Sequence, residues 1–169
     1  MDWLSIVTFF PMVGVLLLML VPSSQHHTIK LVSLLVAIAT MLVSFYIGYF
    51  FDPIASGMQF EVDLPWVKSL GIGYHMGIDG ISLLLILLTT ILTVLCILSS
   101  WKSITTSVKG YYISMLVLTT GMLGVFCALD LFLFYVFWEV MLIPMYFIIG
   151  LWGGPRRVYA AIKFVLFTM

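Results

Sequence analysis

Glu139 is the one acidic residue in the middle of a long apolar run, LFLFYVFWEVMLIPMYFIIGLW, which covers residues 131–152. A charged side chain in hydrocarbon is costly, so acids at such positions usually face a protein interior or a water-filled path. A carboxyl group there can change its protonation state when burial or a nearby cation changes its surroundings. The position therefore predicts a group that takes up and releases protons. The plainer alternative is a neutral carboxyl that hydrogen-bonds to a neighbouring helix.

Pro144 and Lys163 are the two residues that could modify this chemistry. Pro144 lacks the amide hydrogen that would bond the carbonyl of Val140, which predicts a helix kink just past Glu139; the alternative is a proline that only shapes packing. Lys163, in AAIKF, is the other charge inside an apolar run. It either takes part in proton transfer or extends its amine to the nearby membrane surface. Its depth differs from that of Glu139 by roughly 10 Å, so we expect no direct ion pair, although water could link the two.

Asp79 and Asp130 each stand directly before an apolar run, in GIDGISLLL and in LDLFLFYVF. A carboxylate at the start of a helix accepts hydrogen bonds from the first free amide groups and interacts favourably with the helix dipole. The two positions therefore predict helix caps, with a part in a proton path on the outer side as the alternative.

The composition indicates a membrane protein. Of 169 residues, 63% are hydrophobic and 8% are charged, and the mean hydropathy is +1.24; these values lie far from those of soluble domains. Seven basic and seven acidic residues leave no net charge, which argues against a nucleic-acid-binding surface. Cys96 and Cys127 have no partner at metal-ligand spacing, and no apolar run holds two histidines, so we expect no metal, haem or other cofactor.

Five stretches approach the ~20 residues that a membrane-spanning helix needs. They cover residues 3–25, 31–51, 80–101, 110–129 and 131–155. A sixth begins after Arg157 and reaches only to Met169. The prediction is an all-α polytopic transmembrane helix bundle with five full spans and the start of a sixth, as part of a longer protein.

Alternating crossings place the charges unevenly on the two sides of the membrane. One side receives five of the six lysines and arginines outside the spans, and the other receives Lys68 and every acid except Glu139. Cytoplasmic loops carry the excess of basic residues, so the amino terminus is predicted on the outer side. The one long connection, 52–77, lies on that side, and its alternating segments 59–66 and 71–79 predict a short hairpin.

Several motifs together resemble the subunit M family, the antiporter-like membrane subunits of respiratory complex I. They are DLPW (63–66), HMGIDGISLLL (75–85), SSWKSI (99–104), ALDLFLFYVFWEVMLIPMYFIIGLWGG (128–154) and AAIKF (160–164). The resemblance covers nearly the whole chain and implies its amino-terminal third. It implies helices 1 to 4 with the outer loop in residues 1–128, and the start of the proton-antiporter core in residues 129–169.

This resemblance also implies a function. The family forms half-channels around broken helices, and its buried fifth-helix glutamate matches Glu139. The lysine that pairs with it stands on a seventh helix beyond Met169, and Lys163 matches a sixth-helix position without that partner's role. The implied function is proton translocation within NADH:quinone oxidoreductase, in a bacterial cytoplasmic or mitochondrial inner membrane. We expect other membrane subunits, lipid and protons as partners, no soluble substrate, and no redox centre in this chain.

Two alternatives remain open. The related D-type subunit of the Mrp-type multisubunit Na⁺/H⁺ antiporters shares much of the core with subunit M. A structural or assembly component that conducts nothing belongs to a different class. The sequence after residue 169, with or without an interrupted seventh helix bearing a lysine, would separate conduction from a structural role.

Overall fold

The computed structural model describes residues 2–55, 57–67 and 72–169. Within them the chain forms six helices and one two-stranded sheet. The helices are α1 (Trp3–Leu20), α2 (His26–Phe50), α3 (Gly80–Ser103), α4 (Val108–Cys127), α5 (Leu131–Trp152) and α6 (Arg157–Thr168), and the strands are β1 (Gln59–Val67) and β2 (Ile72–Ile78).

The helix prediction is confirmed. Helices α1 to α5 have 18–25 residues and are long and apolar enough to cross a membrane, whereas α6 has 12. Hydrocarbon offers no water to bond free amide and carbonyl groups, so an apolar run satisfies them internally by forming a helix. The predicted runs differ from the helices mainly at the ends. His26, His27 and Lys30 belong to the first turns of α2 rather than to the loop before it.

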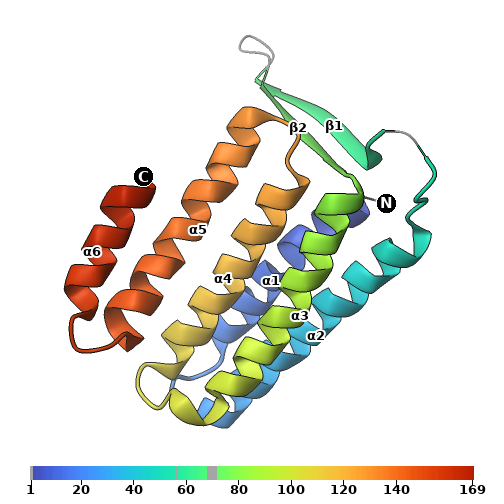
Figure 1. Ribbon diagram of the computed structural model, residues 1–169. Coiled ribbons are helices and arrows are strands. Elements are labelled where there is room, and N and C mark those ends of the chain that lie inside the picture. The colour runs from blue at the N-terminus through green and yellow to red at the C-terminus, as the bar shows by residue number, and fades with distance from the viewer. Residues whose placement is uncertain (1, 56, 68–71) are drawn as a thin grey trace.

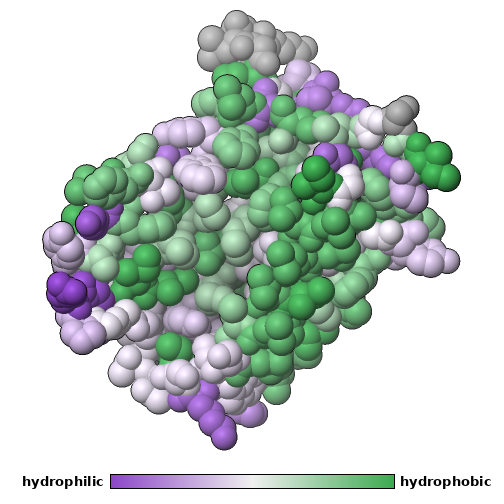
Figure 2. Space-filling model, in the orientation of Figure 1, coloured by the Kyte–Doolittle hydropathy of each residue, from purple (hydrophilic) through white to green (hydrophobic). Residues whose placement is uncertain are grey.

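The helices run up and down as a bundle in which α4 is central (Figure 1). Helix α4 contacts α1, α2, α3 and α5, and α6 packs along α5 at the edge. One buried cluster, which includes Leu4, Met76, Leu123 and Phe137, lies toward the sheet, and a second, around Tyr112, lies toward the other end. The visible face over α2 and α3 is mainly hydrophobic, with hydrophilic residues at both ends (Figure 2).

Strands β1 and β2 pair antiparallel, with Asp63 opposite His75, so the predicted hairpin is confirmed. Its connection, residues 68–71, lies outside the described residues. The Leu129 amide donates to the carbonyl of His75 at 2.9 Å, and the hydroxyls of Ser5 and Tyr74 are 2.8 Å apart. The hairpin is thereby tied to the start of α1 and to the α4–α5 junction. We call this the hairpin end of the bundle, and the end with connections 21–25, 104–107 and 153–156 the loop end.

Basic side chains cap the carbonyl ends of the three helices that finish at the loop end. Lys109 Nζ donates to two carbonyls at the end of α1, both at 3.0 Å. Arg157 Nη1 donates to Leu151 O of α5 at 2.9 Å, and Lys30 Nζ donates to Trp101 O of α3. The last carbonyls of a helix have no partner within it and carry its negative dipole end, so each cation stabilises the end it touches.

Candidate functional site

Glu139 lies on α5, eight residues after its first residue, or ~12 Å from the hairpin end of the helix at 1.5 Å per residue. Its Oε1 atom is buried and has no hydrogen-bond partner within the described residues. Tyr135, one turn earlier on α5, interacts with the carboxylate. A buried polar atom without a partner is uncommon in native structures and costs free energy. The carboxylate of Glu139 is thus only partly satisfied by this chain.

Glu139 lines a cavity of about 400 Å³ between α5 and the end of α6. Four further residues of α5, one residue of α6 and the residue after α6 also line it, and they are Leu142, Ile143, Tyr146, Phe147, Val165 and Met169. Because these side chains carry no charge, Glu139 is the one acidic side chain of the cavity. A proton, or a water molecule or cation that reaches the buried oxygen, could satisfy it.

Two glycines of α4 set the position of α5. A Cβ atom at Gly121 would lie 3.0 Å from Met141 Cβ and 3.2 Å from the Met141 backbone nitrogen. A Cβ at Gly124 would overlap the ring of Phe137. Small residues at such contacts allow two membrane helices to approach closely. The close contact presses Phe137 and Met141 against α4, which leaves Glu139 between them directed toward a different face of α5.

Pro144 is buried, and α5 continues through it as one α-helix. Its ring helps to line a cavity of about 350 Å³ that also includes Val117 of α4. The kink that Pro144 predicts in the sequence stays a prediction. The packing against α4 is compatible with either role considered for this proline.

Lys163 is exposed on α6 and lines a different cavity from that of Glu139. Its Nζ lies 5.7 Å from the centre of the Phe167 ring, and the two residues line a cavity that also includes Arg156 and Tyr159. Glu139 lines a different cavity. Among the described residues Lys163 forms no ion pair with Glu139, in accord with the difference in depth expected from the sequence.

Asp79 and Asp130 cap helices at the hairpin end. Asp79 Oδ1 accepts from the Ser82 amide at 2.7 Å, at the start of α3. Asp130 Oδ1 accepts from the amides of Phe132 at 2.8 Å and Leu133 at 3.0 Å, at the start of α5. The backbone amide of Ser82 lowers the pKa of Asp79, and that of Leu133 lowers the pKa of Asp130, because amide donors favour the charged carboxylate.

The hairpin adds titratable side chains that the sequence did not single out as a group. His75 Nε2 lies 2.6 Å from Glu61 Oε1 across the strands. The Tyr74 hydroxyl is half-buried against α1, and burial raises its pKa. The sequence-based predictions include neither these hairpin contacts nor the role of Gly121 and Gly124. The spacing of the two glycines, G-M-L-G inside a span, is nevertheless a signal of a close contact between helices.

Comparisons with known proteins agree with this fold. The family described as NADH:quinone oxidoreductase/Mrp antiporter, transmembrane, matches residues 128–169. The chain is 42% identical over 167 residues to NAD(P)H-quinone oxidoreductase chain 4 of Chara vulgaris chloroplasts, and 47% identical over 170 residues to NADH-quinone oxidoreductase subunit M of Rhodobacter capsulatus. Each match covers 98% of this chain and 34% or 32% of the relative, so the chain spans about one third of the length of these relatives.

Two solved structures share the fold. A chain of respiratory complex I from Thermus thermophilus matches with a TM-score of 0.77 and 27% identity, over 97% of this chain and 32% of that one. A chain of the Mrp complex from Dietzia sp. matches with a TM-score of 0.76 and 18% identity, over 97% and 17%, which shows a common fold alone. Over nearly its whole length the chain is similar in sequence to the membrane subunits named subunit M and chain 4 of the NAD(P)H-quinone oxidoreductases, and it spans about one third of each.

Proposed function

We propose that this chain is part of a proton-translocating membrane subunit of NADH:quinone oxidoreductase, and that Glu139 exchanges protons in a half-channel. The observation that carries the proposal is the buried Oε1 atom of Glu139, which has no hydrogen-bond partner among the described residues, on a side chain that lines a cavity. A carboxylate left partly unsatisfied can be stabilised by a proton, by water or by a nearby cation. Its protonation then follows whichever of these is present, which is the property that a proton relay requires.

The coupling to quinone reduction is part of the same proposal. A cation that approaches Glu139 during the reaction favours its charged form, and a cation that withdraws favours proton uptake. By the resemblance described above, we propose that this cation is a lysine on a seventh helix of the full subunit. Lys163 lines another cavity, nearer the loop end, so its proposed role is that of a separate proton-exchanging group. We place no redox centre in this chain and assign electron transfer to partner subunits.

The proposed orientation puts the hairpin end on the outer side of the membrane, together with the amino terminus. The basic residues gathered at the loop end support this orientation. Asp79 and Asp130 would then stand at the outer surface, as helix caps and as possible members of an outer proton path. We propose the division of the chain at residues 128 and 129, with the start of the antiporter core in 129–169.

Replacing Glu139 with Gln in the full complex tests the relay. The change keeps the size of the side chain and removes its acid–base chemistry. We expect NADH-driven proton uptake into vesicles to fall relative to NADH oxidation, while the complex assembles normally. The matched control is Glu61→Gln on the hairpin, which changes an exposed carboxylate in the same way. Proton uptake equal to that of the control, at equal assembly, would refute the relay.

Two other functions give different results. A D-type subunit of an Mrp Na⁺/H⁺ antiporter would purify without NADH-dependent quinone reduction and would exchange sodium for protons. The similar TM-scores do not distinguish this subunit from a quinone oxidoreductase subunit by fold, whereas the sequence relatives favour the quinone oxidoreductase. A structural component would tolerate Glu139→Gln with no change in proton uptake.

A further inference from the structure

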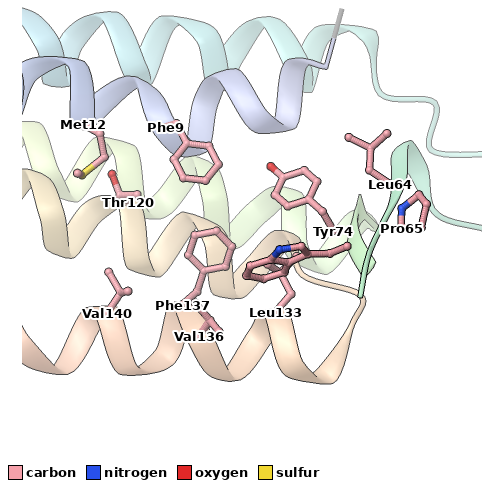
Figure 3. Close-up of a pocket in the computed structure, with 11 residues that line it drawn as sticks. Phe9, Met12, Leu64, Pro65, Tyr74, Thr120, Leu133, Val136, Phe137 and Val140 are labelled. Carbon is pink, nitrogen blue, oxygen red and sulfur yellow. The ribbon is translucent and has the colours of Figure 1, made fainter. Parts of the chain in front are cut away.

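A further cavity, of about 680 Å³, lies among α1, α4 and α5 and ends at the hairpin (Figure 3). Phe9 of α1 and Phe137 of α5 both line it and pack against each other, with ring centres 6.0 Å apart. Leu64, Pro65 and Tyr74 of the hairpin lie at one end of the cavity (Figure 3), and Trp66 of the hairpin also lines it. Phe9 is 42% exposed and Trp66 59% exposed, so the cavity opens onto the surface of the bundle.

The cavity extends through about two thirds of one membrane leaflet. Along α5 it is lined from Leu133 to Val140, seven residues or ~10 Å. Half of a hydrocarbon core of ~30 Å is ~15 Å. The cavity therefore starts near the membrane surface, at the hairpin, and ends close to the middle of the bilayer.

The walls of the cavity suit a hydrocarbon chain. None of its lining residues is charged. The Tyr74 hydroxyl is already bonded to Ser5, and Thr120 Oγ1 is buried and without a partner among the described residues. Thr120 lies beside Met12 and Val140, at the end away from the hairpin. Besides this hydroxyl and the indole N–H of Trp66, the side chains of the walls offer a polar headgroup no free partner, whereas an acyl chain would gain dispersion contacts with four aromatic rings.

The charges at the hairpin end select among headgroups. Glu61, Asp63, Asp79 and Asp130 stand on or next to the hairpin, and the sequence there adds one base, Lys68, which lies outside the described residues. This excess of negative charge repels anionic headgroups and attracts amines. The exposed Trp66 ring at the mouth of the cavity can also contact a cation.

We propose that this cavity binds one acyl chain of a phospholipid with an amine-bearing, net neutral headgroup, taken from the leaflet at the hairpin end. The acyl chain lies along the packed rings of Phe9 and Phe137, and the headgroup lies beside Trp66 at the acidic hairpin. The proposal concerns a different face of α5 from that of Glu139 and does not depend on proton translocation.

The test is the number of lipids that the purified full complex retains. Val136→Phe places a ring in the cavity, and the matched control Leu16→Phe places the same ring on an exposed position of α1, 62% exposed, outside it. Native mass spectrometry after exchange into mixed phosphatidylethanolamine and phosphatidylglycerol should show one fewer retained phosphatidylethanolamine in Val136→Phe alone. Thr120→Val, which removes only the hydroxyl, should retain the lipid.

A second measurement on the unaltered complex covers the case in which Val136→Phe fails to assemble. Phosphatidylethanolamine with a photoreactive acyl chain should label residues 9–12 and 133–140. An unchanged lipid count in Val136→Phe, absence of label from both segments, or retention of phosphatidylglycerol instead would overturn the proposal. Loss of the ligand in Thr120→Val would also overturn it, because the ligand would then depend on a hydrogen bond.

Discussion

Replacing Gly124 with alanine should disturb the contact that positions the helix of Glu139. The added Cβ would lie 2.5 Å from Phe137 Cε1 and closer still to Cγ and Cδ1. Carbon atoms in normal contact are ~3.5–4.0 Å apart, so the ring must move by at least ~1 Å. Phe137 is 5% exposed and packs in the buried cluster with Leu133 and Leu123, so the ring loses these contacts if it moves into the cavity that it lines. Otherwise helix α5 must shift away from α4.

The expected cost follows from two opposing terms. Overpacking of this kind costs ~1–3 kcal/mol of the free energy of unfolding. Alanine also favours a helix over glycine by ~1 kcal/mol, which offsets part of that cost. Gly48→Ala in α2 is the matched control, because it gains the same helix preference while its Cβ meets the nearest atom at 3.7 Å. The difference between the two variants, ~1–3 kcal/mol, therefore isolates the contact with Phe137.

The assay is denaturant-induced unfolding of the purified complex in one detergent, for both variants side by side. The double variant Gly124→Ala with Phe137→Leu should recover part of the loss, since the smaller side chain leaves room for the new methyl group. If Gly124→Ala is as stable as Gly48→Ala, the close contact does not hold α5 and the reasoning is wrong. The same preparations can be tested for proton uptake, because Glu139 follows Phe137 by two residues.

Two further predictions concern the helix ends. Lys109→Met removes the cation that caps α1, so hydrogen exchange in residues 18–21 should become faster and the helix end should lose ~0.3–1 kcal/mol of stability. The control Lys102→Met removes an equal charge from an exposed position and should leave this exchange unchanged. Equal exchange in the two variants would contradict the cap. Asp130→Ala should speed exchange at the Phe132 and Leu133 amides. Because those amides hold the pKa of Asp130 below its usual value, the cap stabilises α5 above pH ~3.9 and is lost as the pH falls through the lowered folded pKa. Exchange at the start of α5 should therefore rise below pH ~4 in the unaltered protein and show no such step in Asp130→Ala; the same acid dependence in both would count against this account.

The spans and the hairpin could be predicted because the membrane restricts the backbone so strongly. A long uncharged run has to be helical, and alternating polar and apolar residues between two such runs leave few options other than paired strands. The depth of Glu139 followed from its distance to the nearest charges. Its direction did not, since the face that a residue occupies depends on which side of α5 packs against Gly121 and Gly124 of α4.

Contacts between distant segments could not be predicted from the sequence either, because they also depend on how the helices pack. The positive charge of Lys109 was counted as a signal of orientation, while its contacts with Met19 and Val21 depend on how α1 packs beside α4. The free hydroxyl of Thr120 and the cavity beside it likewise arise only when three helices and the hairpin come together. A single span gives no indication of these neighbours.

Helix α1 obtains its polar partners late during synthesis. Thr8 reaches Cys127, 119 residues further along the chain, and Ser5 reaches Tyr74, 69 residues further along. At ~5–20 residues per second the ribosome needs ~6–24 s to supply the segment that contains Cys127. Until then the hydroxyl of Thr8 has only its own backbone to bond. The first helix to enter the membrane is thus held in its final place only after the fourth has been made.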